Sequence, residues 1–211
     1  MIRTILRSIS TILIAGGAAL ALWCGYSWFR IHQVANMPVP PPTAAAPAGQ
    51  PRLPGETPGV DEGIAPAGHT NVQRGTWLAK LEAPSVHLQA TVLEGTDDGT
   101  LAKAAGHIEG TALPGPTGNI GLAGHRDTVF RAVRHLDLGD ELTLTTAERV
   151  YRYRITRTEI VDPEEVWVLR PMPQPTLTLV TCYPFDAIGH APRRFIVHGD
   201  LIAADARQTI P

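Results

Sequence analysis

The sequence of 211 residues is poor in the features that mark several common protein classes. It has two cysteines, Cys24 and Cys182, too few for the disulfide framework of a small secreted domain. Lys and Arg total 18 and Asp and Glu total 20, so the net charge of -2 argues against a protein that binds polyanions. Because 44% of the residues are hydrophobic and 18% are charged, a fully disordered chain is also excluded. The length leaves room for one folded domain with additional segments.

The N-terminal region contains a long run without charge. Residues 8–29 form a stretch of 22 uncharged residues, enough for a helix to cross the hydrocarbon core of a bilayer, which is about 30 Å thick. Arg3 and Arg7 precede this run, which favours a cytoplasmic N-terminus. We expect residues 1–34 to form a single-pass transmembrane anchor in the plasma membrane, with the rest of the chain on the extracytoplasmic side.

Two other export signals compete with the anchor. Residues 19–21 (Ala-Leu-Ala) resemble a small-residue cleavage site, so a cleaved signal peptide stays open, although the apolar run is longer than such peptides need. A lipoprotein with Cys24 as the lipid acceptor would require a small residue before the cysteine, and Trp23 stands there. All three interpretations place the folded part outside the cytoplasm.

The chain after the anchor divides by composition. Residues 35–71 are rich in Pro, Ala and Gly and carry few large apolar side chains, so they cannot form a core. Proline at this density favours an extended linker, and we prefer a passive stalk over a ligand for an SH3-type domain. We expect the folded domain at residues 72–204 and a tail at residues 205–211.

The domain has the short, alternating segments of a β-rich fold. In residues 149–161, Tyr151, Tyr153 and Ile155 alternate with arginines, as in a strand with one buried face. So many short strands favour an all-β, closed or nearly closed barrel, with only short helices. Strands are predicted at residues 77–81, 87–93, 119–123, 141–146, 149–161, 176–181 and 195–202, and helical segments at 100–105, 129–135 and 164–169.

The alternation of arginine and tyrosine in residues 149–161 could also indicate a surface that binds nucleic acid. From residue 71 onward the chain has 14 Lys and Arg against 17 Asp and Glu, a net charge of -3. A solvent-exposed strand face is the better interpretation, and we expect no nucleic-acid partner.

Cys182 is the candidate nucleophile. It follows the apolar run 176–181 directly, and a free thiol outside the cytoplasm is exposed to oxidation, which favours a thiol that is used over one that is only packed. A nucleophile needs a base and a donor for the developing oxyanion. His125 follows the apolar segment 119–123, and Arg194 opens the last predicted strand with a permanent cation. Each residue alone also has an ordinary structural explanation.

Other histidines offer weaker alternatives. His107 forms a second Gly-His pair and is either a further candidate or part of a packed turn. His190 and His198 with it could suggest zinc, but no spacing typical of zinc ligands is present, so we expect no metal and no other cofactor.

Three segments together resemble the sortases, a family of exported cysteine transpeptidases. Residues 178–182 (TLVTC) resemble the cysteine signature of the family, residues 122–128 (LAGHRDT) its histidine segment, and residues 191–197 (APRRFIV) its arginine segment. Residues 182–185 (CYPF) and 106–115 are most similar to class D. The resemblance covers most of residues 76–202. It implies an eight-stranded β-barrel on an N-terminal membrane anchor.

The resemblance also implies an activity. Cys182 would be the nucleophile, His125 the acid and base, and Arg194, rather than its neighbour Arg193, the group that stabilises the substrate and the oxyanion. The expected substrates are proteins with a C-terminal LPxTG-like sorting signal, cleaved through a thioacyl enzyme. The acyl group would then pass to an amine of a peptidoglycan precursor or of a protein.

Two alternatives keep the fold or the thiol but change the function. Another cysteine transpeptidase or peptidase would place its cysteine in a different context or before the histidine. A non-enzymatic domain that binds envelope ligands from a membrane tether would use Cys182 only for packing.

Overall fold

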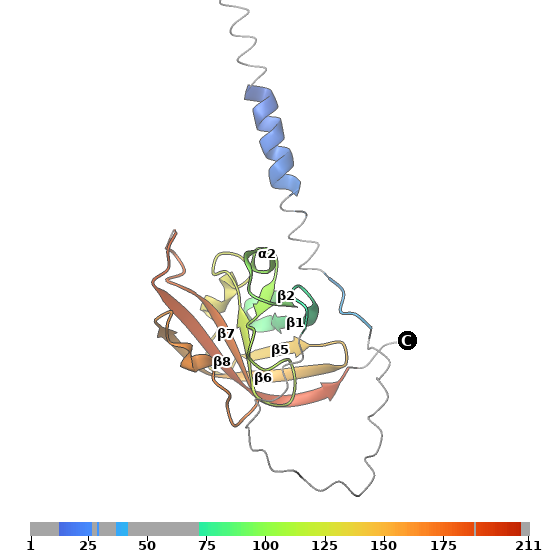
Figure 1. Ribbon diagram of the computed structural model, residues 1–211, viewed down its shortest axis with the longest axis vertical. Helices are drawn as coiled ribbons and strands as arrows, with labels where there is room; N and C mark the ends of the chain where they lie inside the picture. Colours follow the sequence, from blue (N-terminus) through green and yellow to red (C-terminus); the bar gives the residue numbers. More distant parts are fainter. Residues whose placement is uncertain (1–12, 27–28, 30–36, 42–71, 188, 208–211) are drawn as a thin grey trace, which may run out of the picture.

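Eight strands close into a barrel in the computed structural model (Figure 1), which describes residues 13–26, 29, 37–41, 72–187 and 189–207. Around the barrel the strands follow the order β1, β2, β3, β4, β7, β8, β6, β5. This confirms the predicted all-β barrel of eight strands. The strands are β1 (Trp77–Ala83), β2 (Leu88–Glu94), β3 (Ala105–His107), β4 (Asn119–Ala123), β5 (Glu141–Thr145), β6 (Arg149–Val161), β7 (Thr176–Tyr183) and β8 (Arg193–Ala206).

The connections carry the few helices. They are η1 (Pro84–Val86), α2 (Asp98–Leu101), η2 (Arg131–His135) and η3 (Val166–Leu169), each of five residues or fewer. Strand pairs are antiparallel except β2 with β3 and β4 with β7, which run parallel. The parallel pairing of β4 and β7 brings the ends of both strands to the same edge of the barrel.

The helix predicted at residues 100–105 is wrong over most of its length. The helix α2 ends at Leu101, and Ala105 already begins β3, a strand that the sequence pattern did not predict. Asp97 caps the start of α2, since its side chain accepts hydrogen bonds from the amide and the hydroxyl of Thr100. Strand β3 is held by pairing with β2 and β4 on its two sides, which its own three residues do not reveal.

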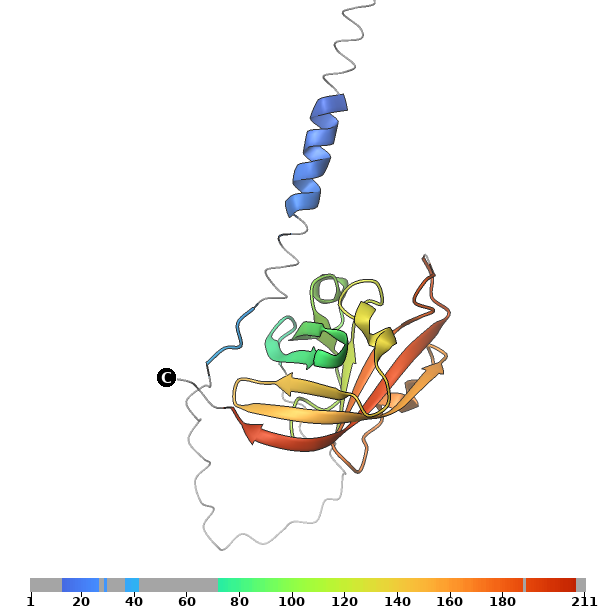
Figure 2. The same ribbon diagram turned by 180° about the vertical axis from the view of Figure 1, so that it is seen from behind.

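The predicted alternation along β6 is confirmed. Tyr151, Tyr153 and Ile155 are buried in the barrel core, and the arginines between them are exposed. Burial raises the pKa of the Tyr153 hydroxyl above its ordinary value. In Figure 2, the reverse view, β6 and β8 run side by side along the barrel, in agreement with their long antiparallel register.

A second, smaller apolar cluster lies on the outer face of the barrel. Leu177 and Leu179 belong to the interior core, whereas Val180 packs in the second cluster, as the two-residue alternation of a strand requires. This cluster consists of Val161, Val168 and Ile196, with Leu169 and Val180 packed against it. Two of these residues come from η3, so η3 covers the outer face where β6, β7 and β8 run together.

The N-terminal part of the chain is described only in pieces. A helix covers residues 13–26, inside the predicted anchor. Among the described residues no helix reaches the length and hydrophobicity that a membrane crossing requires. The rest of the predicted anchor and most of the predicted linker lie outside the described residues. Within residues 37–41, the Pro40 carbonyl accepts a hydrogen bond from Arg207, which directly follows β8.

Candidate active site

Strands β7 and β8 place Cys182 opposite Arg194. Their antiparallel register pairs these two residues and, two positions along, pairs Val180 with Ile196. Residues directly opposite each other in an antiparallel pair project from the same face of the sheet. Because Val180 and Ile196 pack beneath η3 outside the barrel, Cys182 and Arg194 also project from the outer face.

The surroundings of Cys182 differ from those of a core residue. Cys182 is half-buried near the end of β7 and forms no disulfide bond. Arg194, a permanent cation, is its partner on the facing strand. The predicted alternative of a cysteine sealed in the barrel core does not agree with this position.

His125 comes to the same edge from β4. Ala123 pairs with Val180, and the next amide, that of Gly124, donates a 3.2 Å hydrogen bond to the Val180 carbonyl. The Thr181 hydroxyl donates a 2.7 Å hydrogen bond back to the Gly124 carbonyl. These bonds keep the chain beside β7 past the end of β4, so His125 follows at the level of Cys182. The His125 side chain is exposed.

Gly124 is required by packing rather than by the backbone angle. A Cβ atom at this position would lie 2.7 Å from the ring of Phe130, which is fully buried. The Phe130 amide also donates a 2.9 Å hydrogen bond to the carbonyl of His125. The turn that presents His125 is therefore fixed to the barrel core.

Neighbouring arginines of β8 point in different directions. The Arg194 guanidinium donates to the carbonyls of Ala191 and Arg193, at 3.2 and 3.0 Å. The exposed side chain of Arg193 lies 3.7 Å from the carboxylate of Asp162. Alternation along the strand puts the two arginines on opposite faces, and only Arg194 shares a face with Cys182.

Arg126 joins the histidine turn to the loop after β7. It is buried, and its Nη2 donates to the carbonyls of Ala187 and Gly189, at 2.7 and 2.9 Å. Arg134 holds the same loop through a 2.8 Å ion pair with Asp186. The sequence analysis assigned no role to Arg126. The available signal was its position directly after the candidate histidine.

The three candidate residues converge without touching. Within the described part of the chain, no hydrogen bond or ion pair joins the side chains of Cys182, His125 and Arg194. Catalytic hydrogen bonds are often long in the absence of substrate and shorten in the complex. The arrangement offers a thiol, an imidazole and a guanidinium at one edge of the barrel, the set that nucleophilic acyl transfer requires.

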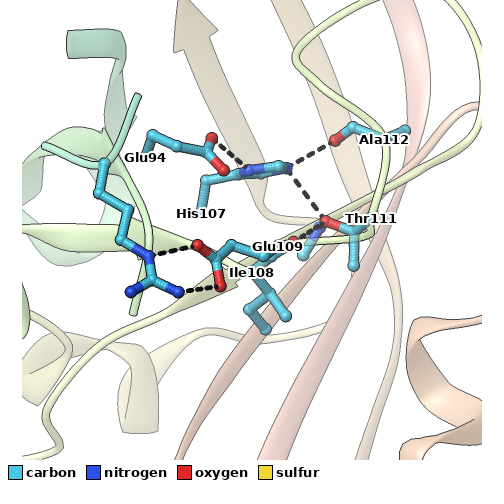
Figure 3. Close-up of polar contacts among 8 residues, drawn as sticks. Glu94, His107, Ile108, Glu109, Thr111 and Ala112 are labelled. Atoms are coloured by element: carbon cyan, nitrogen blue, oxygen red, sulfur yellow. Dashed lines mark hydrogen bonds and ion pairs between the residues drawn. The ribbon is translucent and has the colours of Figure 1, made fainter. Parts of the chain in front are cut away.

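His107, the second histidine candidate, is occupied by structural contacts (Figure 3). Its side chain is 2% exposed, and its Nδ1 lies 2.8 Å from the carboxylate of Glu94. Its Nε2 faces the Ala112 carbonyl at 2.9 Å and the Thr111 hydroxyl at 3.1 Å. Both ring nitrogens are used, so His107 is a structural residue. It lies at the end of strand β3 and not in the packed turn that the sequence suggested as one interpretation.

Neither a cluster of metal ligands nor the cavity described here involves the candidate residues. The described residues contain no group of three or more His, Cys, Asp or Glu side chains that could hold a metal ion. A cavity of about 550 Å³ is lined by residues of β2, of the α2–β3 connection and of the 128–135 region, among them Lys103, Arg131 and Arg134. Cys182, His125 and Arg194 do not line it.

Comparison with known proteins decides the family. The model of the sortase domain matches residues 81–202, more than half of the chain. The chain belongs to the sortase family. This confirms the predicted resemblance.

Among curated relatives, this sortase is 39% identical to Sortase D of Bacillus subtilis over 120 residues, which are 56% of this chain and 61% of that protein. It is 30% identical to Sortase A of Listeria monocytogenes over 138 residues, 64% of this chain and 60% of the relative. The chain thus spans about 60% of the length of these relatives.

Solved structures agree with the fold and include class D. The Sortase D5 transpeptidase of Clostridium perfringens is 30% identical, with a TM-score of 0.57, over 63% of this chain and 83% of that chain. Sortase A of Listeria monocytogenes is 27% identical, with a TM-score of 0.58, over 63% of this chain and 92% of that chain. The predicted sortase fold is confirmed.

Proposed function

We propose that this sortase is a membrane-anchored cysteine transpeptidase that cleaves an LPxTG-like sorting signal and transfers the acyl group to an amine. The observation that carries the proposal is the pairing of Cys182 with Arg194 on the outer face of the barrel, with His125 at the adjoining end of β4. Family membership supports the reaction class. The sorting signal and the acceptor are inferred from the family resemblance.

In the first half of the reaction, Cys182 attacks the carbonyl carbon of the threonine in the sorting signal. The thiolate forms the new C–S bond, and the carbonyl oxygen becomes an oxyanion in the tetrahedral intermediate. The Arg194 guanidinium is a permanent cation with fixed donors, suited to that oxyanion. The C–N bond to glycine then breaks, and His125 protonates the departing amine.

In the second half, an amine replaces the leaving group. His125, now neutral, accepts a proton from the incoming amine as the nitrogen attacks the thioester. The C–S bond breaks and Cys182 leaves as a thiolate. The acceptor is an amine of a peptidoglycan precursor or of a second protein, and water in its place gives hydrolysis. The residues require no cofactor for these steps.

The chain organisation that we propose follows from this function. Residues 1–34 anchor the enzyme in the plasma membrane, with the N-terminus in the cytoplasm. Residues 35–71 form the linker, residues 72–204 the extracytoplasmic catalytic barrel, and residues 205–211 the tail. An outward-facing barrel on a stalk would meet exported proteins near the membrane surface.

The test is cleavage of sorting-signal peptides by the purified full chain. The wild type should cleave an LPxTG-type peptide and, with an amine present, form the transpeptidation product, both followed by liquid chromatography and mass spectrometry. Cys182→Ala should abolish both products. Cys24→Ala is the matched control, because Cys24 is the other free thiol and lies in the helix over residues 13–26, so its loss should leave the rate unchanged.

Full cleavage by Cys182→Ala would overturn the proposal. A domain that only binds envelope ligands would give a different result. Such a domain would leave every peptide intact, and its Cys182→Ala variant would still bind the envelope ligand.

A further inference from the structure

A buried chain of polar side chains lies on the outer face of the barrel, in line with Cys182. The register that pairs Cys182 with Arg194 also pairs Thr178 with His198, four residues further along both strands. Thr178 and His198 are almost completely buried. Between the two pairs lies the apolar pair of Val180 with Ile196, about 7 Å from each at the rise of a strand.

Hydrogen bonds join residues of four strands in this chain. The Thr178 hydroxyl lies 2.9 Å from Nδ1 of His198, and Nε2 of His198 lies 3.0 Å from the carboxylate of Glu159 on β6. The Thr178 hydroxyl also donates a 2.7 Å hydrogen bond to Oδ1 of Asn119, the first residue of β4. We call Glu159, His198, Thr178 and Asn119 the polar relay.

The polar relay ends on η3. The Asn119 amide nitrogen donates to the carbonyls of Val168 and Arg170, at 3.0 and 3.1 Å. Arg157 contacts the same segment from β6, with its guanidinium 5.5 Å from the centre of the Trp167 ring. The connection between β6 and β7 is thus held by polar bonds at its base. Its Val168 packs in the outer apolar cluster with Ile196 and Val180, the pair that lies two residues from Arg194 and Cys182.

The directions of these bonds fix a proton on His198. Because the Asn119 amide nitrogen is committed to two carbonyls, its oxygen must accept from Thr178. The Thr178 hydroxyl has then used its only hydrogen, so it accepts from Nδ1–H of His198. The Glu159 oxygen that faces Nε2 also lies 3.0 Å from the Arg157 guanidinium and is an acceptor. The complete relay therefore requires both N–H groups of an imidazolium.

We propose that the polar relay is a positioning device for the outer face on which the substrate meets Cys182, and that protonated His198 holds η3 in place on that face. When His198 loses its proton, Nε2 and the Glu159 carboxylate become two acceptors that face each other. To keep the bond to Glu159, the neutral ring must carry its one hydrogen on Nε2, and Nδ1 then accepts the hydrogen of Thr178. The oxygen of Asn119, the residue that holds η3, loses its donor, so the support for η3 weakens. The expected effect on substrate binding rests on the proposed function. The expected effect on η3 does not.

The charges around His198 set the direction of the pH effect. Burial lowers the pKa of His198, the hydrogen bond to Glu159 and the negative charge of Asp200 oppose this, and the nearby positive charge of Arg157 adds to it. Thr178, its partner on β7, does not titrate. A lowered pKa means that the proton is lost as the pH rises toward neutrality. Support for η3 is thus complete where His198 is protonated and decreases as the pH rises through its lowered pKa.

Glu159→Gln is the decisive variant. A glutamine amide can donate to Nε2 of a neutral imidazole, so this variant completes the relay without the extra proton. The full-length wild type should show a KM for the sorting peptide that rises about tenfold between about pH 5 and 8, the value of one hydrogen bond to a charged group. Glu159→Gln should keep the low KM throughout. In both proteins kcat should follow the same pH profile.

The matched control removes a charge elsewhere on the barrel. Glu141 on β5 pairs with Arg154 at 3.2 Å, and both side chains are about half exposed. Glu141→Gln should retain the wild-type rise in KM. If Glu159→Gln also retains it, or if its kcat changes in place of KM, the proposal is overturned.

Hydrogen–deuterium exchange tests the relay without any peptide substrate. At one mildly acidic pH, amides of residues 162–175 should exchange about tenfold faster in His198→Ala than in the wild type, with the barrel strands unchanged. Equal exchange in 162–175 would contradict the proposal. If His198→Ala does not fold, the same comparison between wild type and Glu159→Gln at about pH 8 decides, with slower exchange expected in the variant. If no peptide is cleaved, the proposed function fails and the exchange result still stands.

Discussion

Two Gly-His pairs of similar sequence have very different environments. Gly106-His107 lies in β3 between two neighbouring strands, and its imidazole is buried against Glu94. Gly124-His125 lies just past the end of β4, and its imidazole is exposed beside the end of β7. Both glycines are dictated by packing, since a Cβ at Gly106 would collide with the carbonyl of Gly95 and one at Gly124 with Phe130.

The difference shows what a histidine needs for proton transfer. Both ring nitrogens of His107 have hydrogen-bond partners inside the protein, so neither is available to a substrate. The His125 ring makes no hydrogen bond within the described part of the chain, which leaves both nitrogens for a substrate and a thiol. A histidine inside a strand stabilises the barrel, and one that follows a strand end is available for chemistry.

Of the variants that test this comparison of histidines, His125→Ala has the largest expected effect. In His125→Ala, kcat for the sorting peptide should fall by about 10³-fold, because general acid and base catalysis contributes about 10² to 10⁴ in rate. The side chain is exposed, so urea unfolding should give a stability close to that of the wild type. Equal rates in variant and wild type would contradict the assignment of His125.

His107→Phe is the control for the same comparison. This change leaves the Glu94 carboxylate buried without its partner, which costs about 3–5 kcal/mol of unfolding free energy. The folded fraction should keep its kcat. A loss of turnover with unchanged stability would mean that the two histidines had been assigned the wrong way round.

A smaller effect is expected for the paired arginines. Arg194→Ala should lower kcat by about 10² to 10³, the usual cost of removing one oxyanion donor. Arg193→Ala should change kcat by less than about twofold, because Arg193 does not share a face with Cys182. Its exposed contact with Asp162 bears only on stability, by at most about 1 kcal/mol. Steady-state kinetics of both variants checks this. If Arg193→Ala loses activity while Arg194→Ala keeps it, the oxyanion donor is Arg193 and not Arg194.

Much of the fold follows from local pattern. The alternation around Tyr153 predicts β6 with its exact bounds, and the apolar segment 119–123 predicts β4, because one or both faces of these strands are buried. Strand β3 could not be predicted, since Ala, Gly and His have no strand pattern of their own. It forms because β2 and β4 offer open hydrogen-bonding edges on both sides.

The candidate site likewise has residues that could be predicted from the sequence and residues that could not. Cys182, His125 and Arg194 could be named because each lies in a segment that resembles a family motif, and the register of β7 and β8 adds a reason to prefer Arg194 over Arg193. The relay through His198 and Glu159 could not be named. His198 and Glu159 are 39 residues apart in the sequence and meet only through contacts between strands.

The most direct test of the central claim is the mass of Cys182 after reaction with a sorting-signal peptide in the absence of an amine. The full-length enzyme, quenched in acid, should carry an added mass equal to the acyl part of the peptide, located by proteolysis and mass spectrometry on the fragment that contains Cys182. Cleavage of the peptide with Cys182 unmodified, or an adduct on another residue that survives in Cys182→Ala, would contradict the account.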